Sequence, residues 1–127
     1  MAASPVFAVT PRMTAVSIAT ADSSYTAPTN VGTLITGAST GTRVSEIVVK
    51  CAATSAAAIV RIFLYDGSTY WLFDEITIAA ATGSSTVQQT RVSTTYNNLI
   101  LPSSSWSVRA TTSVSQATHV TAFGADL

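Results

Sequence analysis

The chain has 127 residues, of which six are basic and six acidic, so its formal net charge is zero. This length suits one compact domain. With 47% hydrophobic residues it does not resemble a disordered chain, because disordered chains are poor in apolar residues and usually carry a high net charge. Direct binding of DNA or RNA is excluded, since it needs a basic surface that six scattered basic residues do not provide.

Small hydroxyl side chains replace the usual charges. The sequence contains 21 Thr and 17 Ser, together 38 of 127 positions, whereas only 9% of its residues are charged. Globular proteins average roughly 25% charged residues, so the surface is expected to consist largely of Ser, Thr, Ala and backbone. An uncharged surface promotes association. The composition therefore predicts a protein that works packed against copies of itself or against partners.

Membrane, metal and disulfide chemistry are not expected. No apolar run approaches the roughly 18 residues of a membrane helix, and the N-terminus lacks the basic and apolar regions of a signal peptide. Cys51 is the only cysteine and His119 the only histidine, so neither an internal disulfide nor a Cys/His metal cluster can form. Cys51 ends an apolar alternation, which predicts a buried and inert thiol. We predict no metal and no cofactor.

The first elements in chain order are an arm and three strands. Residues 1–13 contain Pro5 and Pro11, which favour extended backbone and predict an N-terminal arm before a domain of residues 14–127. Strands are predicted at 14–20, 31–36 and 43–51, separated by polar and glycine-rich turns. Strict alternation in 43–51 puts Val44 on the same, wetter face as Glu46 and Lys50.

A hairpin is predicted in the middle of the chain. Residues 57–65 form the most apolar strand, with Arg61 as its only charged residue, so both of its faces are covered or one meets a partner. Asp66 and Gly67 are the strongest turn signal in the chain. The return strand, 70–78, places Trp71 and Phe73 on one face by alternation.

Four further strands complete the prediction, at 86–93, 96–101, 106–111 and 117–123. Eight to nine strands at regular spacing indicate an all-β, single-domain antiparallel β-sandwich that is jelly-roll-like, with a closed barrel as the alternative.

Catalytic chemistry has no recognisable support. Asp74 and Glu75 are adjacent in a strand, so they point to opposite faces and cannot form a catalytic carboxylate pair. The single His119 has no G-x-S-x-G nucleophile motif beside it, and the glycine-rich turns lack the Lys and helix of a phosphate-binding loop. We predict that the protein is not an enzyme.

An aromatic group flanks the predicted hairpin, and Tyr96, Asn97 and Asn98 are candidates to extend it. One interpretation is a sugar-binding platform; the other is sandwich core or a subunit interface. Residues of the arm suit strand addition to a neighbouring sheet. The candidate interface residues are Pro5, Phe7, Pro11, Tyr65, Tyr70, Trp71 and Phe73.

The segments GTRVSEIVVKCAATSAAAIVRIFLYDGSTYWLFDEITI and LILPSSSWSVRATTSVSQATHVTAFGADL, with SIATADSS, resemble a family of small structural proteins of tailed bacteriophages. Its pattern is a strand ending in Val-Lys, an A-x-x-V-R-x-F-x-x-D-G hairpin, an L-x-L-P turn, a Ser-x-Arg-Ala strand and a terminal F-G-A-D. The resemblance covers residues 14–127. It implies a virion component, first a capsid decoration (cement) protein and second a tail or head-fibre component.

The resemblance also implies partners. Phage cement proteins are commonly small β-rich domains that sit as trimers on the outside of the shell, so the expected partners are the major capsid protein and two further copies of the chain. The expected location is the virion, assembled in the host bacterial cytoplasm. The resemblance assigns no catalytic or binding residue.

Overall fold

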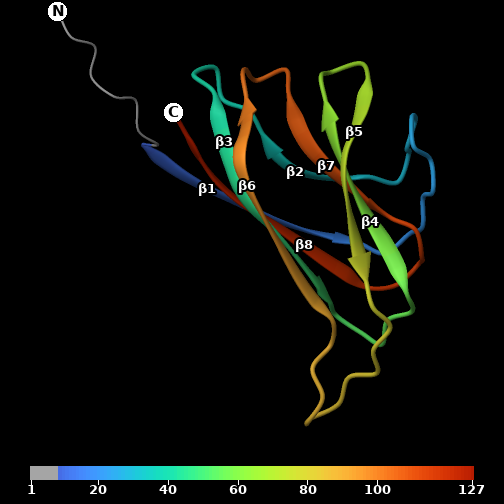
Figure 1. The fold of residues 1–127 in the computed structure, drawn as a ribbon. Coiled ribbons are helices and arrows are strands. Elements are labelled where there is room, and N and C mark those ends of the chain that lie inside the picture. The colour runs from blue at the N-terminus through green and yellow to red at the C-terminus, as the bar shows by residue number, and fades with distance from the viewer. Residues whose placement is uncertain (1–8) are drawn as a thin grey trace, which may run out of the picture.

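The structure is a computed structural model that describes residues 9–127, and its regular elements are eight β-strands (Figure 1). Within this range no helix is long and apolar enough to cross a membrane. The strands are β1 (Thr10–Ile18), β2 (Gly32–Thr36), β3 (Thr42–Cys51), β4 (Ala58–Tyr65), β5 (Tyr70–Ile78), β6 (Arg91–Leu101), β7 (Ser107–Thr112) and β8 (Thr118–Asp126).

The strands form two four-stranded antiparallel sheets that face each other (Figure 1). Sheet A has the order β1-β8-β3-β6, and sheet B has the order β2-β7-β4-β5. Apart from the β4–β5 hairpin, successive strands alternate between the sheets, which is the connectivity of a jelly roll. The predicted single-domain antiparallel β-sandwich is confirmed.

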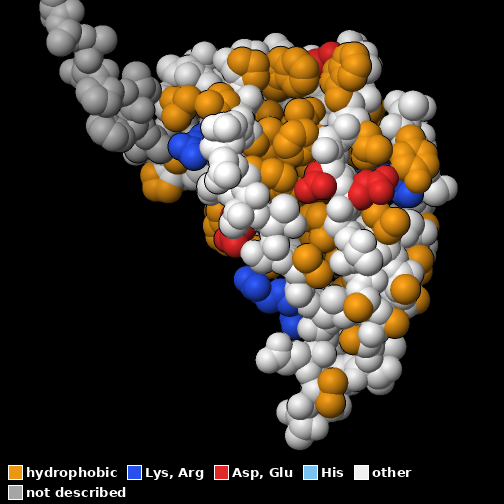
Figure 2. Space-filling model, viewed as in Figure 1, with side chains coloured by type: hydrophobic (Ala, Val, Ile, Leu, Met, Phe, Trp, Pro, Cys, Tyr) orange, Lys and Arg blue, Asp and Glu red, His pale blue; other side chains and the backbone are white. Residues whose placement is uncertain are grey.

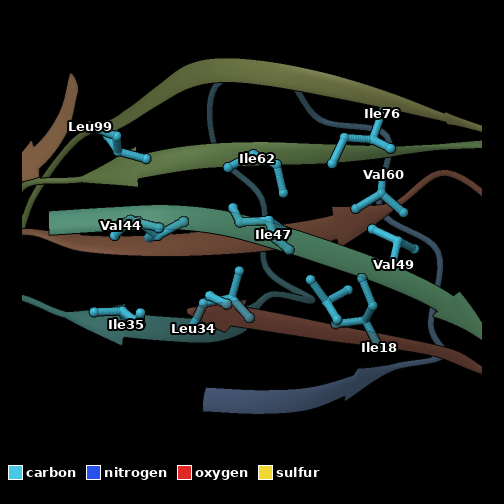
Figure 3. Close-up of a cluster of buried hydrophobic side chains, with 14 of the residues drawn as sticks. Ile18, Leu34, Ile35, Val44, Ile47, Val49, Val60, Ile62, Ile76 and Leu99 are labelled. Atoms are coloured by element: carbon cyan, nitrogen blue, oxygen red, sulfur yellow. The ribbon is translucent and has the colours of Figure 1, made fainter. Parts of the chain in front are cut away.

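The core lies between the two sheets, and side chains from both inner faces interdigitate there (Figure 3). Val44, Ile47 and Val49 of β3 face Val60 and Ile62 of β4, and all five are fully buried. Burying each such side chain stabilises the fold by roughly 1.5–3 kcal/mol. Because β3 and β4 have neighbours on both sides, the most apolar segments of the chain occupy the centres of the sheets.

The predicted boundary of the N-terminal arm is wrong within the described residues. Strand β1 begins at Thr10 instead of residue 14, and Pro11 pairs with Ala125 of β8. Proline is tolerated there because β1 is an edge strand of sheet A. The arm positions Pro5 and Phe7 lie outside the described residues.

The predicted strands 86–93 and 96–101 are one strand, β6, which starts at Arg91. The segment before it is a loop. Its Ser84 hydroxyl accepts hydrogen bonds from the backbone N–H groups of Thr86 and Val87, and such local bonds compete with strand pairing. The alternation of apolar and polar residues in 86–93 does not reveal that competition.

A β-bulge in β3 changes which residues share a face. The register shifts between Val44 and Glu46, so Val44 is buried beside Ile47 although alternation predicts it on the face of Glu46 and Lys50. Opposite Val44 lies Gly124, where a Cβ atom would collide with a backbone carbonyl oxygen of β3. Only glycine fits this close approach.

Candidate interface

The turn of the β4–β5 hairpin is held by one carboxylate. Asp66 accepts hydrogen bonds from the backbone N–H groups of Thr69 (2.7 Å) and Ser68 (2.8 Å), and from the Trp71 indole N–H (3.1 Å). These bonds, that from Thr69 first, lower the pKa of Asp66 to about 2. Gly67 adopts a φ of +102°, which supports the predicted Asp-Gly turn.

A second β-bulge lies within the predicted aromatic group, at Phe73 of β5. Leu72 pairs with Phe63 and Asp74 with Ile62, so Phe73 is an extra residue in β5. Before the bulge, Tyr70 pairs with Tyr65 on the outer face of sheet B, on the same side as Phe63. Trp71 pairs with Leu64, which packs against the core, so the four aromatic residues predicted as one group lie on both faces of sheet B.

The outer side carries a closed group that we call the tyrosine cluster: Phe63, Tyr65, Tyr70 and Arg109. The rings of Tyr65 and Tyr70 are 4.3 Å apart, and Phe63 meets Tyr70 edge to face at 5.8 Å. The Arg109 guanidinium lies 4.1 Å from the Tyr65 ring and donates a 3.0 Å hydrogen bond to the Tyr70 hydroxyl. Phe63 is fully buried, although it is not part of the core between the sheets.

The other side carries a more open group, which we call the aromatic edge: Trp71, Phe73 and Tyr96. Trp71 is 53% exposed and Phe73 is 42% exposed, so their interpretation as sandwich core is wrong. The Phe73 ring lies 5.4 Å from the ring of Tyr96, which comes from β6. Because β5 and β6 are edge strands of opposite sheets, the aromatic edge spans the opening between them, and Figure 2 shows apolar side chains gathered on that face.

Tyr96 ties the aromatic edge to sheet B through a polar contact. Its hydroxyl donates a 2.8 Å hydrogen bond to Asp74 of β5. Burial first, and then this hydrogen bond and the Asp74 charge, raise the pKa of the phenol well above its usual range. The contact links the two sheets across the open side and fixes the Tyr96 ring against Phe73.

The carboxylates near the hairpin do not converge on one site. Asp74 accepts from Tyr96, while the neighbouring Glu75 faces the Arg61 Nε at 3.4 Å. Among the described residues, no three His, Cys, Asp or Glu side chains lie close enough to hold a metal ion. Cys51 is buried and unpaired, as predicted.

Sequence reasoning missed the contacts of Arg61. Its side chain is 7% exposed, its guanidinium lies 4.2 Å from the Tyr25 ring, and it donates a 2.9 Å hydrogen bond to the Tyr25 hydroxyl. Tyr25 belongs to the long loop between β1 and β2. The only signal in the sequence was a single arginine in an otherwise apolar strand, which does not reveal what covers it.

Comparison with known proteins adds little. No protein-family model matches the sequence, and no curated protein matches it. A chain from the structure of infectious bursal disease virus Gx strain resembles it with a TM-score of 0.23 and 14% sequence identity. The matched region covers 94% of this chain and 38% of that chain. A similarity at this level carries no functional argument.

Proposed function

We propose that this protein is a structural component of a tailed-bacteriophage virion, a capsid decoration protein that binds the major capsid protein from outside and stabilises the shell. The observation that carries the proposal is the aromatic edge, where Trp71 and Phe73 are exposed on a surface otherwise rich in Ser and Thr. Contiguous exposed apolar side chains mark interaction sites. The sequence resemblance to phage structural proteins points to the same class.

The jelly-roll architecture is compatible with this role without selecting it. Such double-sheet domains occur in viral capsids and also in lectins, and a fold by itself does not define a function. The support therefore comes from the surface. A chain with zero net charge and few charged side chains has little electrostatic repulsion to oppose packing into a lattice.

In the proposed mechanism, three copies act together over a junction between capsid subunits. Each contact is weak, but linking three contacts in one trimer raises the effective affinity by orders of magnitude, ~10²–10⁴. The bound trimer clamps neighbouring capsomers and raises the free energy needed to rupture a shell filled with DNA. No covalent or catalytic step is involved.

The arm is proposed to contribute a second contact. Strand β1 is an edge strand of sheet A and follows directly on residues 1–9, so the arm reaches the domain at a sheet border. Addition of its residues to a neighbour's sheet would satisfy edge hydrogen-bonding groups on that neighbour. Removing residues 1–8 is expected to reduce particle occupancy while β1 and the sandwich stay folded.

The experiment compares purified particles with and without the protein under heat and osmotic shock, with DNA retention as the readout. The variant Trp71→Ala/Phe73→Ala should lose particle binding and the protection that it gives. Val87→Ala is the matched control, because Val87 is also 53% exposed but lies in the loop before β6. Equal DNA retention by decorated and undecorated particles would overturn the stabilising role.

A carbohydrate-binding module is the second candidate. It is favoured by the exposed Trp71 ring, whose indole N–H is held by Asp66, since exposed aromatic rings with neighbouring polar groups stack on sugars. Glycan binding that is lost in Trp71→Ala but kept in Tyr70→Ala, whose ring belongs to the tyrosine cluster on the other face, would favour this role when folding is preserved. A tail or head-fibre position is separated from a capsid position by image reconstruction of the particle.

A further inference from the structure

The six basic side chains of this protein differ in the contacts that they make. All six Lys and Arg residues lie within the described part of the chain, and five of them donate a hydrogen bond to a neighbour in the fold, Lys50 to a backbone carbonyl and four arginines to the groups that follow. The four contacts are Arg12 with Asp126 (2.8 Å), Arg43 with the Asn97 carbonyl (2.7 Å), Arg61 with Tyr25 (2.9 Å) and Arg109 with Tyr70 (3.0 Å).

Lys50 and Arg91 lie side by side on the outer face of sheet A. Lys50 of β3 pairs directly with Arg91 of β6 and, on its other side, with His119 of β8. We call these three residues the basic row. They point outward, because their neighbours Val49 and Val120 are fully buried in the core. Figure 2 shows a separate group of Lys and Arg side chains on the lower part of the molecule.

Nothing in the described part of the chain neutralises the basic row. Neither Lys50 nor Arg91 forms a salt bridge there, and the Lys50 ammonium donates only to the backbone carbonyl of Gln89, at 2.8 Å. The next row along the sheet is uncharged, with Val48 paired to Ser93 and Thr121. The nearest carboxylate on this face, Glu46, accepts a hydrogen bond from Ser93.

This arrangement is expected to cost stability. Like charges directly opposite each other in adjacent strands are destabilising, and Lys50 faces Arg91 in a chain that has only six basic residues. Neighbouring outward positions of this sheet carry Ser17, Ser93 and Thr121, and such short uncharged side chains would fit here without repulsion. Conflicts of this kind between a residue and its local environment are typical of functional sites.

We propose that the basic row is a docking site for carboxylate side chains on the surface of a partner protein. Adjacent strands are about 4.8 Å apart, so the row is roughly 10 Å long and fits two or three carboxylates. Arg91 offers the two parallel N–H donors that bind a carboxylate at both oxygens, and Lys50 and His119 extend the row. A shallow surface hollow lined by Ser17, His119 and Thr121 lies at its end.

The short length of the basic row favours a protein over other anionic partners. Nucleic-acid backbones are bound through about 6–10 phosphate contacts, and anionic membranes through clusters of about 4–8 Lys or Arg residues. The basic row has three side chains and ends in the uncharged row at Val48, beyond which Glu46 reverses the sign of the charge. A compact acidic patch on a protein matches this extent.

This inference deepens the proposed function by naming the chemistry of the docking partner. It rests on that function only for the location of the partner, which is a phage particle. Its first test needs no particle. The purified full chain is titrated with poly-L-glutamate at low salt, and binding is followed by NMR at the amides of Lys50, Arg91 and His119. The variant Lys50→Gln/Arg91→Gln should bind roughly tenfold more weakly.

The matched control is Arg43→Gln, which removes an exposed charge from the other end of β3. It should retain poly-L-glutamate affinity within about twofold, because a single charge far from the row contributes little through screened solvent. Equal affinity of the double variant and the wild type would overturn the proposal. Tighter binding of a single-stranded DNA oligonucleotide than of poly-L-glutamate at the same salt would also overturn it.

Particle binding separates this inference from the proposed function. If Lys50→Gln/Arg91→Gln binds particles as well as the wild type does, the docking proposal fails while the decoration role stands. If the wild type binds poly-L-glutamate through the basic row but binds no phage particle, the decoration role fails and the docking chemistry stands.

Discussion

The outer faces of the two sheets differ in what surrounds their basic side chains. On sheet B, Arg61 is stacked on Tyr25 and Arg109 on Tyr65, so both guanidinium groups are covered by aromatic rings. On sheet A, Lys50 and Arg91 lie next to each other without an aromatic or carboxylate partner among the described residues. Basic side chains are therefore packed into the structure on one face and lie without a counter-charge on the other.

The difference follows from what surrounds each strand. Outward positions of β4 and β5 carry Phe63 and two tyrosines, and the loop after β1 brings Tyr25 across the face. Outward positions of β3 and β8 carry a mixture of short side chains, such as Val48 and Thr121, and charged ones, and their one aromatic ring, Phe123, is partly exposed. Sheet B therefore has a small second core on its outer face, whereas the outer face of sheet A has no comparable cluster among the described residues.

The largest predicted effect tests the second core. Phe63→Ala should lower the free energy of unfolding by about 3 kcal/mol, because it removes a fully buried ring and leaves a cavity. Phe123→Ala on the outer face of sheet A should cost only about 0.5 kcal/mol, since Phe123 is partly exposed. Urea denaturation of both variants measures the difference. Similar costs would show that the two outer faces do not differ.

The next effect tests the cover over Arg61. Tyr25→Ala should lower the free energy of unfolding by about 1–2 kcal/mol, because it removes both the stacked ring and the hydrogen bond to a buried guanidinium. Tyr25→Phe keeps the ring and should cost about half as much. The two variants are compared by urea denaturation. An unchanged Tyr25→Ala protein would mean that Arg61 is stabilised by Glu75 alone.

Much of the fold could be predicted from the sequence because the jelly roll depends on alternation and turn chemistry. The hairpin at Asp66 and Gly67 and strand β5 follow from those signals directly. The errors occur where the backbone departs from strict alternation. A bulge depends on contacts with the opposite strand, such as the close approach of Gly124 to β3, and those contacts involve residues about 80 positions apart.

The candidate site was predicted only in part for the same reason. Alternation separates Tyr70 from Trp71, but it places Asp74 on the face of Tyr70. The bulge at Phe73 instead puts Asp74 on the face of Trp71, where it meets Tyr96. The basic row was not predicted, because its three members lie on β3, β6 and β8 and meet only through strand pairing. The net charge of zero does not reveal the local excess of positive charge on the outer face of sheet A.

A smaller effect concerns the loop that carries Tyr25. Asp22 accepts hydrogen bonds from the backbone N–H groups of Asn30, Ser24 and Thr29, and these bonds, that from Asn30 first, lower its pKa below the usual 3.8. A folded-state pKa below the unfolded one gives stability that is complete above about pH 4 and is lost as the pH falls through the folded value.

Asp22→Asn should therefore reduce the loss of stability between pH 5 and pH 2, values about one to two units either side of the ordinary carboxyl pKa. Urea midpoints across this range measure it, and the NMR signals of the Tyr25 ring report whether the loop has moved. Asp66→Asn is the comparison, because it should change the same pH range without affecting Tyr25. Parallel pH curves for wild type and Asp22→Asn would show that the carboxylate does not stabilise the loop.

The smallest effect has the opposite sign and sharpens the contrast between the two faces. Arg91→Gln should raise the free energy of unfolding by about 0.2–1 kcal/mol, because it removes the like charge that faces Lys50. The gain should shrink at high salt, where the repulsion is screened. Arg109→Gln should instead lower stability, since it removes the guanidinium stacked on Tyr65. If both substitutions destabilise the protein, the Arg91 side chain stabilises its own fold. It is then not an unpaired charge that is free to bind a partner.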